Sequence, residues 1–212
     1  LACAAAEVGR GVLTGYQPDI VHAHDWQAAL APVFLRFGGH AVKTVVTVHN
    51  MAFQGQFPAD NFPLLGLPPE AFSLHGVEYY GGVGYLKGGL ACADAITTVS
   101  PTYAEEICTS AFGMGLHGLL HARHTHLHGI VNGIDTAVWN PATDEALAQT
   151  YDIRSLGRRT ANKRALERRF NLAEDDGLLT CVVSRLTWQK GLDILAANLD
   201  TLVASGARLA LL

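Results

Sequence analysis

The sequence predicts an α/β fold built on a parallel sheet. Short apolar or β-branched runs alternate with helical patterns along the whole chain, as in a doubly wound fold. The run at residues 43–48 is almost continuously β-branched, which suits a parallel strand covered on both faces. Polar residues also gather where the predicted strands end, and in such sheets ligands bind at the carboxyl ends of the strands.

The first predicted elements depend on strand runs and helix boundaries. The opening residues continue into Glu7 and Arg10 without a basic flank or a starting Met, so they read as a helix and not as a signal peptide. A later helix closes at Gly38 and Gly39. The predicted order is a helix at the start, a strand at 19–22, a helix at 27–37, a strand at 43–48 and a helix at 85–93.

The remaining elements follow the same alternation. Ser100 and Pro101 have the residue types of a helix cap and a first helical position. The predicted order is a strand at 95–99, a helix at 102–108, a strand at 129–131, a helix at 154–170, a strand at 178–183, a helix at 192–203 and a strand at 208–212.

Residues 51–84 interrupt this alternation. The segment is rich in Gly, Pro and aromatic residues and is too long for a simple connection. We expect a loop there, and loops of that length in compact domains are usually functional.

Composition limits the partners. The formal net charge of −4 gives no general reason to expect nucleic acid or an anionic membrane. No apolar run approaches the roughly 18 residues that a membrane span needs. The four cysteines are widely spaced and form no Cys-x-x-Cys pair, which favours buried free thiols in a reducing compartment, by default the cytoplasm.

Five predicted strands are followed directly by polar residues. Because the carboxyl ends of parallel strands line one edge of a sheet, we expect these residues to border a ligand cleft. They are His24 with Asp25, His49 with Asn50, Ser100, Asn132, and Ser184 with Arg185.

Residues 184–191 read as a basic loop between a strand and the start of a helix. Arg185, Lys190 and the free backbone N–H groups of a helix start would together form an anion site. We expect this site to bind a phosphorylated ligand. The alternative interpretation is that the segment is a solvated surface loop.

Six blocks of the chain resemble bacterial glycogen synthases and plant starch synthases, in the order in which that family carries them. The resemblance covers essentially the whole chain. The blocks are residues 21–27, 47–55, 85–90, 98–107, 130–135 and 184–191.

The resemblance implies a GT-B fold, in which two Rossmann-like domains face each other across a cleft. It also implies that this chain is an internal piece, with both domains incomplete. Residues 1–130 would be the second half of the acceptor-side domain, and 131–212 the interdomain passage and the first part of the donor-side domain. Alone, such a piece is expected to bind its substrates poorly and to transfer no glucose.

The implied activity is transfer of glucose from ADP-glucose to the non-reducing end of an α-1,4-glucan such as glycogen, with retention of configuration and no cofactor or metal. No carboxylate is obviously placed as a nucleophile, so attack from the face of the departing phosphate is favoured over a covalent intermediate. The alternatives are an inactive glucan- or nucleotide-binding homologue and, more distantly, a basic nucleic-acid module. Residues 184–191 do not distinguish ADP-glucose from UDP-glucose, because they would grip the phosphates common to both.

The resemblance assigns roles to five residues. Arg185 and Lys190 would hold the diphosphate, and His49 would contact the transferring glucose unless it is a structural histidine. Asp25 would orient a sugar hydroxyl or stabilise positive charge at the anomeric carbon, with a helix N-cap as the alternative. Asn132 would face the cleft near the domain junction, and a turn-forming role of Asn-Gly is the alternative.

Two further segments, one rich in histidine and one rich in arginine, each allow two interpretations. The family usually has Gly-x-Glu-Gly-Leu where this chain has His117 in place of the glutamate. Any role of that glutamate is therefore in doubt for this chain. Zinc binding by the five histidines from His117 to His128 is the less favoured hypothesis, because no Cys, Asp or Glu accompanies them. The basic segment 154–169 lacks interleaved aromatics and precedes an acidic run, which favours a solvated helix over nucleic-acid binding.

Overall fold

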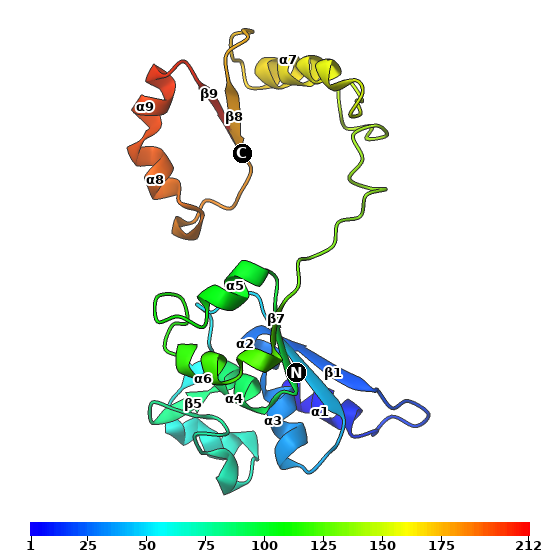
Figure 1. Ribbon diagram of the computed structural model, residues 1–212, viewed down its shortest axis with the longest axis vertical. Coiled ribbons are helices and arrows are strands. Elements are labelled where there is room, and N and C mark those ends of the chain that lie inside the picture. The colour runs from blue at the N-terminus through cyan, green and yellow to red at the C-terminus, as the bar shows by residue number, and fades with distance from the viewer. The chain divides into compact units, whose positions relative to one another are not determined.

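The computed structural model describes all of residues 1–212 and divides the chain into two compact units (Figure 1). The first unit comprises Leu1–Gly133 and the second unit Ile134–Leu212. This division falls three residues beyond the boundary expected at residue 130. The acceptor-side and donor-side roles of the two parts stay predictions.

A four-stranded parallel sheet forms the centre of the first unit. Its order is β1-β2-β6-β7, and every neighbouring pair is parallel, as predicted. The strands are β1 (Ile20–His24), β2 (Lys43–Val48), β6 (Ala95–Thr98) and β7 (Leu127–Gly129).

Side chains alternate between the two faces of this sheet. Ala23, Val46 and Ile96 belong to the main hydrophobic core, where Leu86 and Leu90 pack beside them. The register places His24, Thr47, Thr97 and His128 opposite one another on four successive strands. This polar row therefore lies on the face opposite to the core, because neighbouring strand residues point to opposite sides.

The helices of the first unit follow the predicted order, with one interruption and one addition, because no helix was predicted at His117–Ala122. The helix expected at 27–37 begins at Asp25 and is divided at Ala29. Ser100 caps its helix as predicted, because the Tyr103 N–H donates to its Oγ at 3.2 Å. The elements are α1 (Ala2–Gly9), α2 (Asp25–Ala28), α3 (Leu30–Phe37), α4 (Tyr85–Cys92), α5 (Pro101–Glu106), α6 (His117–Ala122) and the 3-10 turn η3 (His124–His126).

The prediction that residues 51–84 form a loop was wrong, because the segment contains regular secondary structure. A three-stranded antiparallel sheet of order β3-β5-β4 and two 3-10 helices occupy the segment. These strands are too short to show an alternating pattern in the sequence. The elements are β3 (Gln56–Phe57), η1 (Ala59–Leu65), η2 (Pro69–Ala71), β4 (Glu78–Tyr79) and β5 (Gly82–Gly84).

The strand expected at 129–131 lies two residues earlier, at Leu127–Gly129. Its last bond to β6 is the Ile130 N–H to the Thr98 carbonyl oxygen, at 2.8 Å. Ile130 and Val131 are exposed, so the apolar pair that suggested the strand lies beyond it. Asn132 consequently does not follow a strand end directly.

The second unit contains a pair of parallel strands and three helices. The helix expected at 192–203 is broken at Asn198, whose side-chain amide donates to the Ile194 carbonyl at 2.8 Å. The elements are η4 (Leu156–Arg158), α7 (Arg159–Arg169), β8 (Leu179–Val182), η5 (Trp188–Lys190), α8 (Leu192–Ala197), α9 (Leu199–Ala204) and β9 (Arg208–Leu211).

Helix α7 is less solvated than the sequence suggested. Glu167 is fully buried and forms ion pairs with Arg164 at 2.7 Å and with Arg208 of β9 at 2.6 Å. Arg164 also pairs with Asp176 at 2.6 Å. The acidic run that argued against nucleic acid thus folds back onto the basic helix and holds it to the strand pair.

All four cysteines are free, as expected, but their burial differs from the expectation. Cys92 is buried and Cys108 is half-buried, whereas Cys3 and Cys181 are exposed. The prediction of buried thiols is therefore wrong for Cys3 and Cys181. The apolar context in the sequence does not ensure burial, because neighbouring residues on a helix or a strand point in different directions.

The helices are short, and α7 is the longest at 11 residues. None combines the length and the apolarity that are needed to cross a bilayer.

Candidate functional site

The carboxyl ends of β1 and β2 bring together three of the residues that follow predicted strands. The Nδ1 atom of His24 lies 3.0 Å from the Nε2 atom of His49. The backbone N–H of His49 donates to the Asp25 carboxylate at 2.8 Å. The parallel pairing of β1 with β2 causes this convergence, because His24 stands opposite Thr47 and both strands end at one edge.

Asp25 is held by the neighbouring strand and does not cap its helix. The N-cap position of α2 belongs to His24, and no side chain accepts a capping bond there. Asp25 occupies the first helical position with a φ of 54°, in the left-handed region that Asp tolerates better than most residues. This backbone angle accompanies a carboxylate that bonds to the end of β2, so the N-cap alternative is wrong.

A third imidazole extends the pair into a row of three, which we call the histidine row: His22, His24 and His49. The ring centroids of His22 and His24 are 4.3 Å apart, and those of His24 and His49 are 5.3 Å apart, with both pairs stacked. The sequence reasoning did not single out His22. Its signal was the spacing of two residues from His24, which places both rings on one face of a strand.

The surroundings of His22 disfavour its protonated form. Burial lowers the pKa of His22, and the neighbouring imidazoles of His24 and His49 lower it further. His22 Nε2 also lies 2.6 Å from the Thr47 hydroxyl, which in turn lies 2.6 Å from the Thr97 hydroxyl. The row is thus connected to a hydrogen-bonded pair of threonines on the two central strands.

The histidine row is open to solvent. The side chains of His22, His24 and His49 are all exposed, and the Nδ1 atom of His49 makes no bond within the chain. An exposed imidazole with one free nitrogen, beside a carboxylate, can exchange hydrogen bonds with a polyhydroxylated ligand. The site can also place negative charge beside a developing positive charge.

The loop after His49 is fixed by contacts with three other elements. The Met51 N–H donates to the Tyr103 hydroxyl at 3.0 Å, and the Tyr85 N–H donates to the Gly55 carbonyl at 3.0 Å. Gly55 has a φ of 61°, and a Cβ there would stand 2.3 Å from the Trp26 ring. These contacts hold the loop against α2 and so support the position of His49.

Asn132 does not join the histidine row in any recorded contact. It lies three residues beyond β7 in an exposed stretch, and its side chain makes no hydrogen bond within the chain. Its expected role near a domain junction stays a prediction.

Arg185 and Lys190 lie in the second unit. Both are exposed, and neither side chain forms an ion pair or hydrogen bond, unlike Arg164 and Arg208 in the same unit. Lys190 ends the turn η5, and Gly191, with a φ of 70°, precedes α8. Two unpaired cations beside a helix start are free to meet an anion.

The histidines between His117 and His128 do not converge on one point. His121 and His124 have ring centroids 6.0 Å apart, and His124 Nδ1 bonds to the His121 carbonyl oxygen. No group of three or more His, Cys, Asp or Glu residues is placed to hold a metal ion. His117 begins α6, which was not among the predicted elements, and the Nδ1 atom of His117 is buried without a partner.

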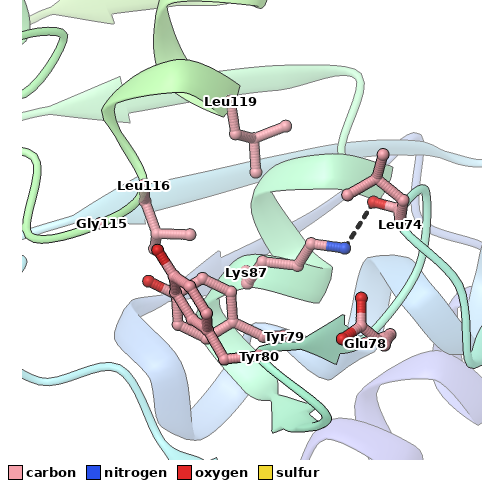
Figure 2. Close-up of a pocket in the computed structure, with 8 residues that line it drawn as sticks. All are labelled: Leu74, Glu78, Tyr79, Tyr80, Lys87, Gly115, Leu116 and Leu119. Atoms are coloured by element: carbon pink, nitrogen blue, oxygen red, sulfur yellow. Dashed lines mark hydrogen bonds between the residues drawn. The ribbon is translucent and has the colours of Figure 1, made fainter.

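A cavity of about 400 Å³ lies elsewhere in the first unit (Figure 2). It contains no residue of the histidine row. Its lining residues are Leu74, Glu78, Tyr79, Tyr80, Lys87, Gly115, Leu116 and Leu119.

Comparison with known proteins gives three findings. The family model described as "Starch synthase catalytic domain" matches residues 1–122. The chain is 61% identical to a glycogen synthase of Novosphingobium aromaticivorans over 99% of its length, and 56% identical to one of Rhizobium tropici over its whole length. It spans 44% of each of these relatives, so about half of their length.

The structure is also similar to a solved one. The catalytic domain of starch synthase IV from Arabidopsis thaliana, described as bound to ADP and acarbose, matches with a TM-score of 0.84 and 31% identity. The match covers 99% of this chain and 44% of the solved chain. This likeness confirms the GT-B type of α/β fold that the sequence predicts.

Proposed function

The chain belongs to the family of starch synthase catalytic domains, and on that premise we propose that it serves glucosyl transfer from ADP-glucose to the non-reducing end of an α-1,4-glucan, glycogen, with retention of configuration. Its relatives are named glycogen synthases. The similar solved domain holds ADP and acarbose, which match the two kinds of substrate proposed. The chain covers about half of these relatives, so the activity is proposed for the protein in which all the necessary parts are present.

The observation that carries this proposal is the contact between Asp25 and the end of β2. The carboxylate accepts the His49 N–H at 2.8 Å, and the His49 ring is exposed beside it. A sugar at this edge would meet an imidazole and a carboxylate together. The imidazole suits hydrogen bonding to a sugar hydroxyl, and the carboxylate suits a positively charged anomeric carbon.

The geometry of Asp25 favours an electrostatic role. Its Oδ1 atom is engaged by the backbone of His49, which fixes the carboxylate in one orientation. Its Oδ2 atom accepts no hydrogen bond within the chain and can lie beside a positively charged anomeric carbon. We favour attack by the acceptor hydroxyl from the face of the departing phosphate, with Asp25 stabilising charge.

Arg185 and Lys190 would hold the diphosphate of the donor. Neither cation is neutralised within the chain, so both can pair with phosphate oxygens. Their positive charge would stabilise the departing ADP, which is the work that Mg²⁺ does in many phosphate sites, and we propose no metal for the step. We assign Asn132 to the substrate side of the cleft, where its free amide would contact a ligand.

The experiment is a transfer assay with ADP-glucose and UDP-glucose as donors and glycogen as acceptor. It compares the 212-residue chain with any longer product of the same gene, and we expect transfer by the longer product alone. His49→Ala and Lys190→Ala should each lower the rate by at least about a hundredfold, the size of one strong transition-state contact. Lys43→Ala is the control, because Lys43 is an exposed lysine of the first unit outside the site.

Near-normal rates in His49→Ala and Lys190→Ala would contradict the assigned roles. A folded longer product that binds glycogen and ADP-glucose but transfers nothing would instead identify an inactive homologue. The compartment that we propose, the cytoplasm, is consistent with four free thiols.

A further inference from the structure

The middle member of the histidine row, His24, makes the hydrogen bond that is recorded for the His49 ring. His24 is exposed at the carboxyl end of β1, and its Nδ1 atom lies 3.0 Å from Nε2 of His49. It is therefore joined directly to the imidazole that we place against the sugar. The two remaining ring nitrogens, Nε2 of His24 and Nδ1 of His49, make no hydrogen bond within the chain. Both are available to a ligand.

The His24 ring is held by its neighbours in the row. Its centroid lies 4.3 Å from that of His22 and 5.3 Å from that of His49, with both pairs stacked. His22 is anchored in turn, because its Nε2 atom lies 2.6 Å from the hydroxyl of Thr47, a buried residue. A ring that packs on two others loses much of its freedom to turn. The His24 ring is therefore fixed before any ligand arrives.

His49 is tied to the end of β1 a second time, through its backbone. Its N–H donates to the carboxylate of Asp25, the residue that follows His24 directly. Two consecutive residues thus hold the backbone and the ring of His49. The bond between the imidazoles joins groups that are already in place, so little conformational entropy is lost when it forms.

The one proton between the two rings allows two arrangements of the neutral pair. In the first, His24 Nδ1 donates, and the proton of His49 is on its outward Nδ1 atom. In the second, His49 Nε2 donates, and the outward Nδ1 atom of His49 is bare. In both arrangements the outward nitrogens are one donor and one acceptor. The direction of the shared bond therefore decides which of them His49 offers to a ligand.

The second arrangement leaves both rings in the commoner tautomer. A free neutral histidine side chain favours the form with its proton on Nε2, and in the second arrangement His24 and His49 both have this form. The first arrangement would require the less common form, with the proton on Nδ1, in both rings. No other hydrogen bond of either ring opposes this preference, because neither ring forms one within the chain.

We propose that His24 is a positioning residue, which holds His49 with Nε2 protonated and Nδ1 bare, so that Nδ1 accepts a hydrogen bond from a hydroxyl group of the transferring sugar. Nε2 of His24 then carries a proton and can donate to a second oxygen of the same ligand. This inference deepens the proposed function and rests on it for the identity of the ligand. The tautomer of His49 itself depends on His24 alone.

The test is ¹⁵N NMR of the histidine rings in the 212-residue chain at pH 8, above the usual imidazole pKa of about 6.5. Protonated and bare ring nitrogens differ widely in ¹⁵N shift, and we expect His49 to show a protonated Nε2 and a bare Nδ1. His24→Leu removes the partner, so both His49 signals should move toward the average of the two tautomers. His24→Asn keeps an amide oxygen near the position of Nδ1 and should restore the parent shifts. His24 is exposed, so both variants should fold.

His128→Leu is the matched control. His128 is an exposed histidine on the same face of the sheet, opposite Thr97, and makes no recorded contact with the histidine row. This variant should leave the His49 nitrogen shifts unchanged. In the longer product, His24→Leu should lower glucosyl transfer about threefold to tenfold, the effect of one lost hydrogen bond, and His24→Asn should restore most of the rate.

Three results would overturn the inference. The first is a protonated Nδ1 atom of His49 in the parent chain. The second is a set of His49 shifts that does not change in His24→Leu, and the third is failure of His24→Asn to restore them. The nitrogen shifts decide the inference without any transfer assay. A longer product that transfers no glucose would therefore contradict the proposed function and leave the assignment of His24 to the spectra.

Discussion

The imidazoles of His24 and His49 share one hydrogen bond, with 3.0 Å between Nδ1 of the first and Nε2 of the second. One of these nitrogens must carry the proton and the other must accept it. If both rings were protonated, two N–H groups would face each other. The shared hydrogen bond therefore couples the tautomers of the two rings at the edge where we place the sugar.

Acidification should destabilise the first unit through His22. Burial, followed by the neighbouring His24 and His49, lowers the pKa of His22 below its usual value of 6.5. The unfolded chain thus takes up this proton first, so stability is lost as pH falls below 6.5, and the loss ends below the folded pKa. Urea unfolding at pH 7.5 and 5.5 should show a smaller difference in His22→Gln than in the parent chain.

The groups that face His22 are the imidazoles of His24 and His49 and the hydroxyl of Thr47. His40→Gln, at an exposed histidine outside the row, is the control. An unchanged pH dependence in His22→Gln would show that the row does not contribute to it.

Replacing Asp25 should separate its structural contact from its charge. Asp25→Asn keeps an oxygen for the His49 N–H and tolerates a φ of 54°, so its stability should be close to that of the parent. Asp25→Ala loses the acceptor and should cost ~1–2 kcal/mol in the free energy of urea unfolding. Glucosyl transfer by the longer product should fall sharply when it carries either substitution. A fully active Asp25→Asn would refute the role of the negative charge.

The positions of the site residues at strand ends could be predicted from the sequence, but their mutual contacts could not. Asp25 and His49 could be predicted, because each follows a recognisable strand and parallel strands end at one edge. For His22 the spacing of two residues from His24 was a signal, but its contact with Thr47 depends on the register that sets Thr47 opposite His24. The bond from Asp25 to the His49 backbone was equally hidden, since it requires a positive φ that no residue pattern announces.

The errors in the fold have a common origin in short elements and exposed apolar residues. Ile130 and Val131 have strand-like side chains but are exposed beyond β7. The strands between residues 51 and 84 span two or three residues each, and β3 pairs with β5, so that Gln56 stands opposite Gly84. Such pairing joins segments that are far apart in the sequence, so a short sequence window does not reveal it.

Acid should also weaken the second unit, at a lower pH and through Glu167. Burial would raise the pKa of this carboxyl, but hydrogen bonds and positive charge from Arg164 and Arg208 outweigh burial and lower the pKa to about 2. The stabilisation is therefore complete above 4.5 and is lost as pH falls from 4.5 toward 2. Glu167→Gln should unfold more readily at pH 7 and show a flatter response to acid.

Thermal unfolding followed by the far-UV signal at pH 7 and pH 3 would measure this response. Glu145→Gln is the matched control, since Glu145 is exposed and forms no recorded ion pair. Equal acid sensitivity of the parent chain and Glu167→Gln would contradict the assigned role of the buried carboxylate.

A pair of glycine substitutions should show how the loop after His49 is held. Gly55→Ala places a Cβ 2.3 Å from the Trp26 ring and strains a φ of 61°, whereas Gly15→Ala strains a φ of 78° with nothing within 4 Å. Gly15→Ala should therefore lower the free energy of urea unfolding only by the cost of a positive φ, ~1–2 kcal/mol. Gly55→Ala should cost more and should broaden the His49 resonances in NMR spectra. Equal costs would mean that Trp26 gives way, and that Gly55 does not fix the loop.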